Sequence, residues 1–312
     1  MLPLYYEYHN PVKILSGEAA LENIPYELHA LEAHAPLLLS DQGLKQVGAV
    51  DTVLHAIAPT VPKAIFTDIP ADSSVAVVNQ IAAYYKEQGC DSILAVGGGS
   101  VIDTAKGVRM VISQNTNDIE SLMGCEVLTA GRHIPFLAVP TTAGTGSEVT
   151  PVAVISNPQK QVKQEYLSAH LLPDAAILDL RMTMTLPPKV TASTGIDALC
   201  HAIESFTCLQ KNPMSDAYAA GAIPLIMRHL PIAAAHPGNK EARKAMANAS
   251  LMAGTSFGNS MVGLVHAIGH ALGGVCHVAH GDAMSILLPH VMAYNLDKCR
   301  SGYSDLLLHL AG

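Results

Sequence analysis

The stretch Ile93-Leu94-Ala95-Val96-Gly97-Gly98-Gly99-Ser100 decides the fold class of this chain. Its first four residues are all apolar, which is typical of a strand buried on both faces, and a helical pattern begins near Val101. Because glycine lacks a Cβ, the backbone amides of this turn can approach an anion at the positive end of the helix. The run matches neither the P-loop nor the GxGxxG fingerprint, so a tight turn without a ligand remains an alternative.

The same alternation of apolar runs and helical stretches continues on both sides of this motif. It predicts βαβ units and therefore a parallel sheet. Strands are expected at residues 36–39, 64–66, 93–96, 136–139, 153–156 and 176–178, with helices at residues 74–88 and 101–113.

The pattern changes at Leu186-Pro187-Pro188, beyond which apolar residues recur at helical spacing. Helices are expected at residues 191–206, 215–229, 240–252 and 263–272, and residues 304–310 look like the opening of another helix. We therefore predict a Rossmann-like α/β domain over residues 1–186 and an all-helical domain over residues 187–312.

The composition excludes several classes of protein. Of the 312 residues, 49% are hydrophobic and 14% are charged, as in an ordered chain with a sizeable core. A net charge of −8 without a basic run argues against nucleic acid and anionic membranes as partners and favours a small ligand. No apolar stretch reaches the length of a membrane span, and no signal peptide is visible. The six cysteines form no CxxC, which favours free thiols in a reducing cytoplasm.

A second polar loop follows the strand expected at residues 136–139. The segment 140–147 contains four hydroxyl side chains, including Thr141 and Thr142, and two glycines. Since ligands of parallel sheets gather at the carboxyl ends of strands, two such loops favour a bound dinucleotide. Asp41 would contact a ribose diol and favour NAD over NADP, or would cap the next helix. Lys163 would contact the cofactor or be a solvated surface charge.

Two pairs of polar residues in the helical region have the spacing of metal ligands. Asp197 and His201 stand four residues apart, as do His266 and His270, so each pair shares one helix face. Together with His280 they predict a site for a borderline divalent ion such as Fe²⁺ or Zn²⁺. A hydrogen-bonded helix pair is the alternative for either pair alone, and His277 is an alternative to His280.

With these residues assembled, the chain resembles the iron-dependent (group III) alcohol dehydrogenases. The resemblance rests on Gly97-Gly-Gly-Ser-Val-Ile-Asp-Thr-Ala-Lys106, Pro140-Thr-Thr-Ala-Gly-Thr-Gly-Ser-Glu148, Gly195-Ile-Asp-Ala-Leu-Cys-His-Ala-Ile-Glu204, Gly263-Leu-Val-His-Ala-Ile-Gly-His-Ala-Leu-Gly273, His280-Gly281 and Leu288-Pro289-His290. These stretches span nearly the whole chain in the order of the family.

The resemblance implies a dehydroquinate-synthase-like fold that binds NAD between its two domains and commonly forms homo-oligomers. It assigns the metal, usually Fe²⁺, to Asp197, His201, His266 and His280, and it places His270 beside substrate and nicotinamide. Asp103 falls on a motif position whose role, ligand contact or loop cap, stays open. The cofactor contacts that it implies are Asp41, Gly98, Gly99, Ser100, Thr141, Thr142 and Lys163.

Three departures from the family pattern stand out. Ala71-Asp72 replaces a common Asn-Pro, and Ala279 replaces the common Pro before the last histidine. Relatives also continue for several helices beyond this terminus, so C-terminal helices are expected to be missing.

The predicted activity is metal-assisted hydride transfer between a small primary alcohol or diol and NAD, with His270 passing the proton towards solvent. Aldehyde reduction by NADH is the reverse reaction at the same site. Two alternatives stay open. One is a relative that resembles glycerol or 4-hydroxybutyrate dehydrogenase, and the other is a truncated, catalytically silent metal- or nucleotide-binding subunit.

Overall fold

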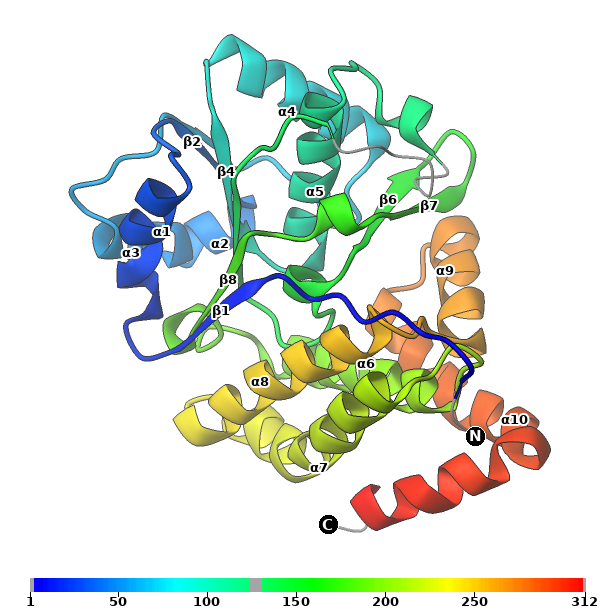
Figure 1. Ribbon diagram of the computed structural model, residues 1–312. Coiled ribbons are helices and arrows are strands. Elements are labelled where there is room, and N and C mark those ends of the chain that lie inside the picture. The colour runs from blue at the N-terminus through cyan, green and yellow to red at the C-terminus, as the bar shows by residue number, and fades with distance from the viewer. Residues whose placement is uncertain (1–2, 124–130, 311–312) are drawn as a thin grey trace. The chain divides into compact units, whose positions relative to one another are not determined.

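The computed structural model describes residues 3–123 and 131–310, and it divides the chain into two compact units (Figure 1). An α/β unit comprises residues 11–141 and 147–185, and a helical unit comprises residues 1–10, 142–146 and 186–312. Of the six cysteines, Cys125 lies outside the described residues and the other five are free. No helix in the described ranges combines the length and the apolar character that a membrane span requires.

The α/β unit is built on a parallel sheet of six strands. Their order is β1-β8-β5-β4-β2-β3, and each neighbouring pair is parallel. The strands are β1 (Lys13–Gly17), β2 (Pro36–Leu39), β3 (Ala64–Phe66), β4 (Ser92–Gly97), β5 (Phe136–Pro140) and β8 (Ala175–Asp179). The predicted parallel sheet is therefore confirmed. The expectation for residues 153–156 was wrong in one respect: they belong to β6 (Val152–Asn157), which pairs antiparallel with β7 (Val162–Leu167) outside this sheet.

Helices cover both faces of the sheet, which explains why residues 93–96 of β4 are all apolar. Ile93 and Ala95 pack in one core with α4 (Val75–Glu87) and α5 (Gly99–Ser113). Leu94 and Val96 point the other way, into a core with α1 (Ile24–Ala30) and α3 (Ala49–Ala56). The short helix α2 (Gln42–Gln46) follows β2. Successive strand residues face opposite sides of a sheet, so a strand covered on both sides has apolar residues at successive positions.

The helical unit contains α6 (Pro188–Thr207), α7 (Pro213–Ala235), α8 (Lys240–Phe257), α9 (Leu264–Cys276) and α10 (His280–Leu310). Residues of α6, α7 and α8 form most of its apolar core, with Leu306 of α10 also buried there. Gly195 allows α6 to pack closely on α7, since a Cβ there would lie 2.2 Å from Leu230 Cδ1. Residues 304–310 do not open a separate helix but end α10, which continues through Pro289. The predicted helical C-terminal half is confirmed.

Candidate metal and cofactor sites

Four side chains from three helices of the helical unit converge on one point. Asp197 and His201 lie one turn apart on α6, His266 lies in the first turn of α9, and His280 is the first residue of α10. Asp197 Oδ1 lies 3.2 Å from His280 Nε2 and 3.5 Å from His266 Nε2, and Asp197 Oδ2 lies 4.0 Å from His201 Nδ1. Asp197, His201 and His266 are buried, and their ligand atoms all lie within 4.8 Å of one another.

Unpaired polar atoms show that this cluster fits a metal ion. Seven buried side-chain nitrogen and oxygen atoms in the described residues have no well-directed hydrogen bond, and three of them are Asp197 Oδ1, His201 Nδ1 and His266 Nε2. A buried polar atom without a partner costs about 1–3 kcal/mol, so three in one place need an explanation. A cation bound between them would pair all three, and one carboxylate with imidazoles suits a borderline divalent ion.

The electrostatics of the cluster favour the metal-binding protonation states of Asp197 and His201, but they favour the protonated form of His266. Burial opposes ionisation of Asp197, but its electrostatic interactions with the His201 and His280 imidazoles and its contact with His266 outweigh it and hold the Asp197 pKa well below its usual range. Burial lowers the pKa of His201 to about 3, so this imidazole is neutral. Burial also opposes the charge on His266, but its contacts with Asp197 and Glu204 raise its pKa to about 9. Metal ligation requires an ionised carboxylate and neutral imidazoles, so a bound ion would displace a proton from His266.

Packing fixes the position of the ligands. The His201 ring is stacked between Phe257 and His266, at centroid distances of 4.2 Å and 4.4 Å. Gly281 lets the start of α10 approach α6, since a Cβ there would lie 2.7 Å from Ser193 Cβ and 2.8 Å from its carbonyl oxygen. This close approach is a physical reason for the His-Gly pair at residues 280–281.

The structure shows how His280, His277 and His270 lie relative to the cluster. His280 contacts Asp197, whereas His277 is exposed at the end of α9 with a left-handed φ of 55°. This geometry favours His280 over His277 as the fourth ligand. His270 lies one turn after His266, and its ring centroid is 5.9 Å from that of His266 and 5.3 Å from that of His280. It borders the cluster without belonging to the group of convergent ligand atoms.

Glu204 is a member of this site that the sequence reasoning missed. It is buried on α6, its Oε1 accepts a hydrogen bond of 2.7 Å from the Val265 amide, and its Oε2 is hydrogen-bonded to His266 Nδ1. A signal existed, because Asp197, His201 and Glu204 follow the i, i+4, i+7 spacing of one helix face.

In the α/β unit, the predicted glycine loop lies at the carboxyl end of β4 and starts α5. Gly98 is the N-cap of α5, so Gly99 and Ser100 lie in the first turn of that helix. The Thr141 amide donates a hydrogen bond of 3.0 Å to the Gly97 carbonyl, which brings the start of the second loop beside the first. The exposed amides of a helix N-terminus at a sheet edge are a suitable site for a phosphate.

Two of the predicted cofactor residues have partners within the chain. Asp41 caps α2 by accepting a hydrogen bond of 2.8 Å from the Leu44 amide. Lys163 Nζ lies 2.7 Å from Asp72 Oδ1, and Ser100 Oγ accepts a hydrogen bond from the Asp72 amide. Asp72 thus connects the Lys163 ammonium to the glycine loop.

The two glycines in the loop at residues 140–147 have packing roles. Thr142–Gly146 belongs to the helical unit, and both of its glycines are required for close packing. A Cβ at Gly144 would lie 2.5 Å from the Thr194 carbonyl oxygen, and one at Gly146 would lie 2.5 Å from Gly254 Cα. Helix packing therefore accounts for glycines that the sequence pattern attributed to ligand binding.

Asp103 and Lys106, from the motif that begins at Gly97, hold the α/β unit together. Asp103 accepts hydrogen bonds from Ser147 Oγ (2.6 Å) and the Val154 amide (3.0 Å), so it fixes a loop. Lys106 is fully buried, and its ammonium donates to the carbonyl and hydroxyl of Thr150 (2.9 and 3.2 Å) and to the Val152 carbonyl (2.6 Å). Burial lowers the Lys106 pKa to about 8 and raises that of neighbouring Glu148 to about 7.

Comparison with known families gives one consistent result along the chain. The profile described as iron-containing alcohol dehydrogenase matches residues 11–180, and the profile of the C-terminal region of the Fe-containing alcohol dehydrogenase family matches residues 191–312. The second match does not support the expectation that C-terminal helices are missing.

Individual relatives agree with the family match. The chain is 38% identical over 297 residues to the probable alcohol dehydrogenase EutG of Salmonella typhimurium, covering 95% of this chain and 75% of that protein. It is also 38% identical over 304 residues to the 1,3-propanediol dehydrogenase of Klebsiella pneumoniae, covering 96% and 78%.

Solved structures show the same fold. The crystal structure of a 1,3-propanediol oxidoreductase superposes with a TM-score of 0.94 at 36% identity, covering 99% of this chain and 80% of that one. A sulfoacetaldehyde reductase from Bifidobacterium kashiwanohense, solved in complex with NAD+, gives 0.87 at 32% identity, covering 94% and 77%. These matches confirm the predicted dependence on iron and NAD and the predicted enzyme class. The chain belongs to the iron-containing alcohol dehydrogenase family.

Proposed function

We propose that this alcohol dehydrogenase acts on small primary alcohols or diols with NAD, and reduces the corresponding aldehydes in reverse. In this proposal Asp197, His201, His266 and His280 hold a divalent ion, Fe²⁺ or Zn²⁺. The observation that carries it is the group of three buried, unpaired ligand atoms on Asp197, His201 and His266. Relatives named for 1,3-propanediol support the small-diol substrate class.

The bound ion would supply Lewis-acid polarisation of the substrate oxygen, and NAD would supply the hydride acceptor. The residues of the chain prepare the site for that chemistry. Asp197 contributes the negative charge that offsets the cation, and the buried neutral His201 offers a lone pair. His270, at the border of the cluster, is proposed to pass the proton of the alcohol towards solvent, since imidazole transfers protons near neutral pH.

The proposed cofactor contacts come from the carboxyl ends of the strands. The amides of Gly98, Gly99 and Ser100 at the start of α5 would bind a phosphate of NAD. Asp41, at the end of β2, would accept from the ribose diol with the oxygen that its cap leaves available, and its charge disfavours a 2′-phosphate. Thr141, Thr142 and Lys163 complete the proposed set.

An anaerobic assay of NADH formation with C2 to C4 alcohols and diols tests the proposal. Wild-type protein reconstituted with Fe²⁺, with Zn²⁺ or with a chelator is compared with the variant His201→Ala. Turnover that requires metal and is lost in this variant supports the proposal. Metal and NAD binding without turnover on any alcohol would contradict it and favour the silent-subunit alternative.

Homo-oligomerisation and a cytoplasmic location remain part of the proposal. The first rests on the family resemblance and is measured by light scattering at several protein concentrations. The second rests on the five free cysteines among the described residues, which are typical of a reducing compartment.

A further inference from the structure

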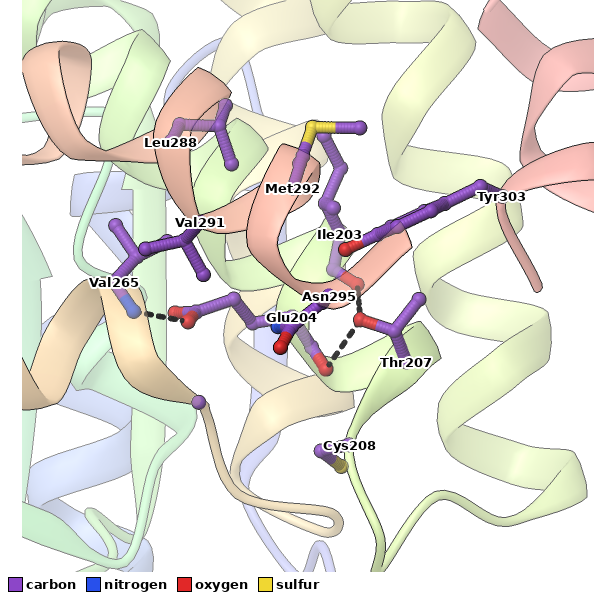
Figure 2. Close-up of a pocket in the computed structure, with 11 residues that line it drawn as sticks. Ile203, Glu204, Thr207, Cys208, Val265, Leu288, Val291, Met292, Asn295 and Tyr303 are labelled. Carbon is purple, nitrogen blue, oxygen red and sulfur yellow. Dashed lines mark hydrogen bonds between the residues drawn. The ribbon is translucent and has the colours of Figure 1, made fainter. Parts of the chain in front are cut away.

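A buried carboxylate lies immediately behind the proposed metal ligands in the helical unit. Glu204 is 5% exposed and accepts hydrogen bonds from two groups of one helix end, the Val265 amide and His266 Nδ1. Figure 2 shows the Glu204 carboxylate directed at the start of α9, with its contact to Val265 drawn. The N-cap of α9 is Gly263, which has no side chain to cap the helix. Glu204 therefore supplies from α6 the acceptor that a local cap residue normally provides.

The second hydrogen bond fixes the chemistry of His266. A neutral imidazole has one N–H donor and one lone pair, and the partner of one nitrogen decides which is which. Because the carboxylate of Glu204 accepts from Nδ1, the proton of the neutral ring stays on Nδ1. The lone pair is then on Nε2, the atom that faces Asp197 at 3.5 Å.

We propose that Glu204 is a positioning residue that sets both the tautomer and the orientation of His266 for metal binding, an inference that rests on the proposed function. Glu204 lies on α6, like Asp197 and His201, and its side chain holds His266 of α9 by a hydrogen bond. Carboxylates in this outer position typically account for a 10- to 100-fold change in metal affinity.

Gly263 has a matching role. A Cβ at this position would lie 2.9 Å from Glu204 Oε1, so glycine leaves room for the carboxylate. Gly263→Ala would thus displace the carboxylate without removing it.

The space around Glu204 allows a chemical-rescue experiment. Glu204 lines a small pocket formed by residues of α6, α9 and α10, among them Thr207, Asn295 and Tyr303 (Figure 2). Truncation in Glu204→Ala would enlarge this pocket where the carboxylate was. A small carboxylate such as formate is then expected to enter and accept the same two hydrogen bonds.

The decisive variant is Glu204→Gln. The Val265 amide and His266 Nδ1 reach different oxygens of the Glu204 carboxylate, so a glutamine amide in the same place presents its acceptor oxygen to one of them and its NH₂ group to the other. We expect Zn²⁺ and Co²⁺ affinity, measured by chelator competition, to fall about 10- to 100-fold. The Co²⁺ absorption bands should shift, and the low-field Nδ1–H proton signal of His266 in Zn²⁺-loaded protein should move. Glu27→Gln is the matched control, since Glu27 is equally buried at 5% but pairs with Lys13 in the α/β unit.

The outcomes separate this inference from the proposed function. Weak metal binding by the wild type itself would overturn both. Tight binding by the wild type and equally tight binding by Glu204→Gln would overturn only the role of Glu204. Recovery of the metal affinity of Glu204→Ala on addition of formate, with no effect of formate on the metal affinity of Glu27→Gln, supports it. If Glu204→Gln does not fold, Gly263→Ala decides: unchanged metal affinity and an unchanged Co²⁺ spectrum would overturn the proposal.

Discussion

The two units of this chain each bury a cluster of charged groups, and the clusters differ in how their polar atoms are paired. In the α/β unit, the Lys106 ammonium has three donors and finds three oxygen acceptors on Thr150 and Val152. In the helical unit, Asp197, His201 and His266 bring together three polar atoms without well-directed hydrogen bonds. The first cluster is complete without a ligand, whereas the second needs one.

This difference is a physical criterion for separating structural from functional polar residues. Burial alone does not distinguish them, since Lys106 and Asp197 are both buried. In a cluster whose polar atoms are all hydrogen-bonded, these bonds offset the free-energy cost of desolvation. In a cluster with unpaired polar atoms, that cost remains until a ligand binds. Variants in the two clusters should therefore affect different quantities.

The largest effect is expected from Asp197→Ala. It removes the carboxylate shared by the three histidines, so metal affinity should fall by more than about 100-fold, beyond the range of outer residues. Chelator competition with Zn²⁺ measures the loss. Asp216→Ala, in the same unit and paired with Lys211, is the control and should bind metal like the wild type. Equal affinity in the two variants would remove Asp197 from the site.

Lys106→Met should affect stability instead. It leaves the carbonyls of Thr150 and Val152 buried without their donor, and the free energy of unfolding should fall by about 3 kcal/mol. Urea denaturation measures this, with the exposed Lys86→Met expected to stay within about 0.5 kcal/mol of the wild type. Metal affinity per folded molecule should not change. A loss of affinity without a loss of stability would break the distinction between the clusters.

Glu148 gives the α/β cluster a predictable pH dependence. Burial raises its pKa in the folded chain from the ordinary 4.5 to about 7. The raised pKa therefore contributes to the stability of the fold, and this contribution is fully present below pH 4.5, where Glu148 is protonated. It is lost as the pH rises through about 7. Relative to the wild type, Glu148→Gln should gain about 2 kcal/mol of stability between these limits. Urea midpoints at pH 5 and pH 8 check the sign, and a constant difference between the two proteins would contradict it.

The smallest effect concerns the half-exposed pair at the glycine loop. Asp72→Asn removes the partner of Lys163 and a negative charge beside Ser100. NADH affinity should rise a few-fold at low salt, and the gain should shrink at high salt because ions screen exposed charges. Fluorescence titration with NADH measures it. A weaker affinity in Asp72→Asn would indicate that Asp72 itself contacts the cofactor.

The sequence predicted those features that depend on local periodicity. The uniformly apolar run at residues 93–96 identified a strand covered on both faces, and the i, i+4 spacing correctly placed Asp197 and His201 side by side. The strand β1 was missed because its side chains are largely exposed or half-buried and show no buried run. Likewise β6 looked like a strand of the main sheet, since pairing partners cannot be read from one strand alone.

The remaining differences come from contacts between distant segments. Lys106 and Glu204 act through residues that are 44 to 62 positions away, so no local pattern marks their roles. Gly144 and Gly146 counted towards a dinucleotide-binding loop, but close packing against the backbones of α6 and α8 explains them. Composition and spacing identify which chemical groups are present, and tertiary packing decides which of them remain unpaired.

The most direct test of the central claim is the anomalous scattering of crystals of the Fe²⁺-loaded protein at the iron edge. The account predicts one strong peak within coordination distance of Asp197, His201, His266 and His280. Iron bound elsewhere, or iron at this cluster with His277 in place of His280, would contradict it.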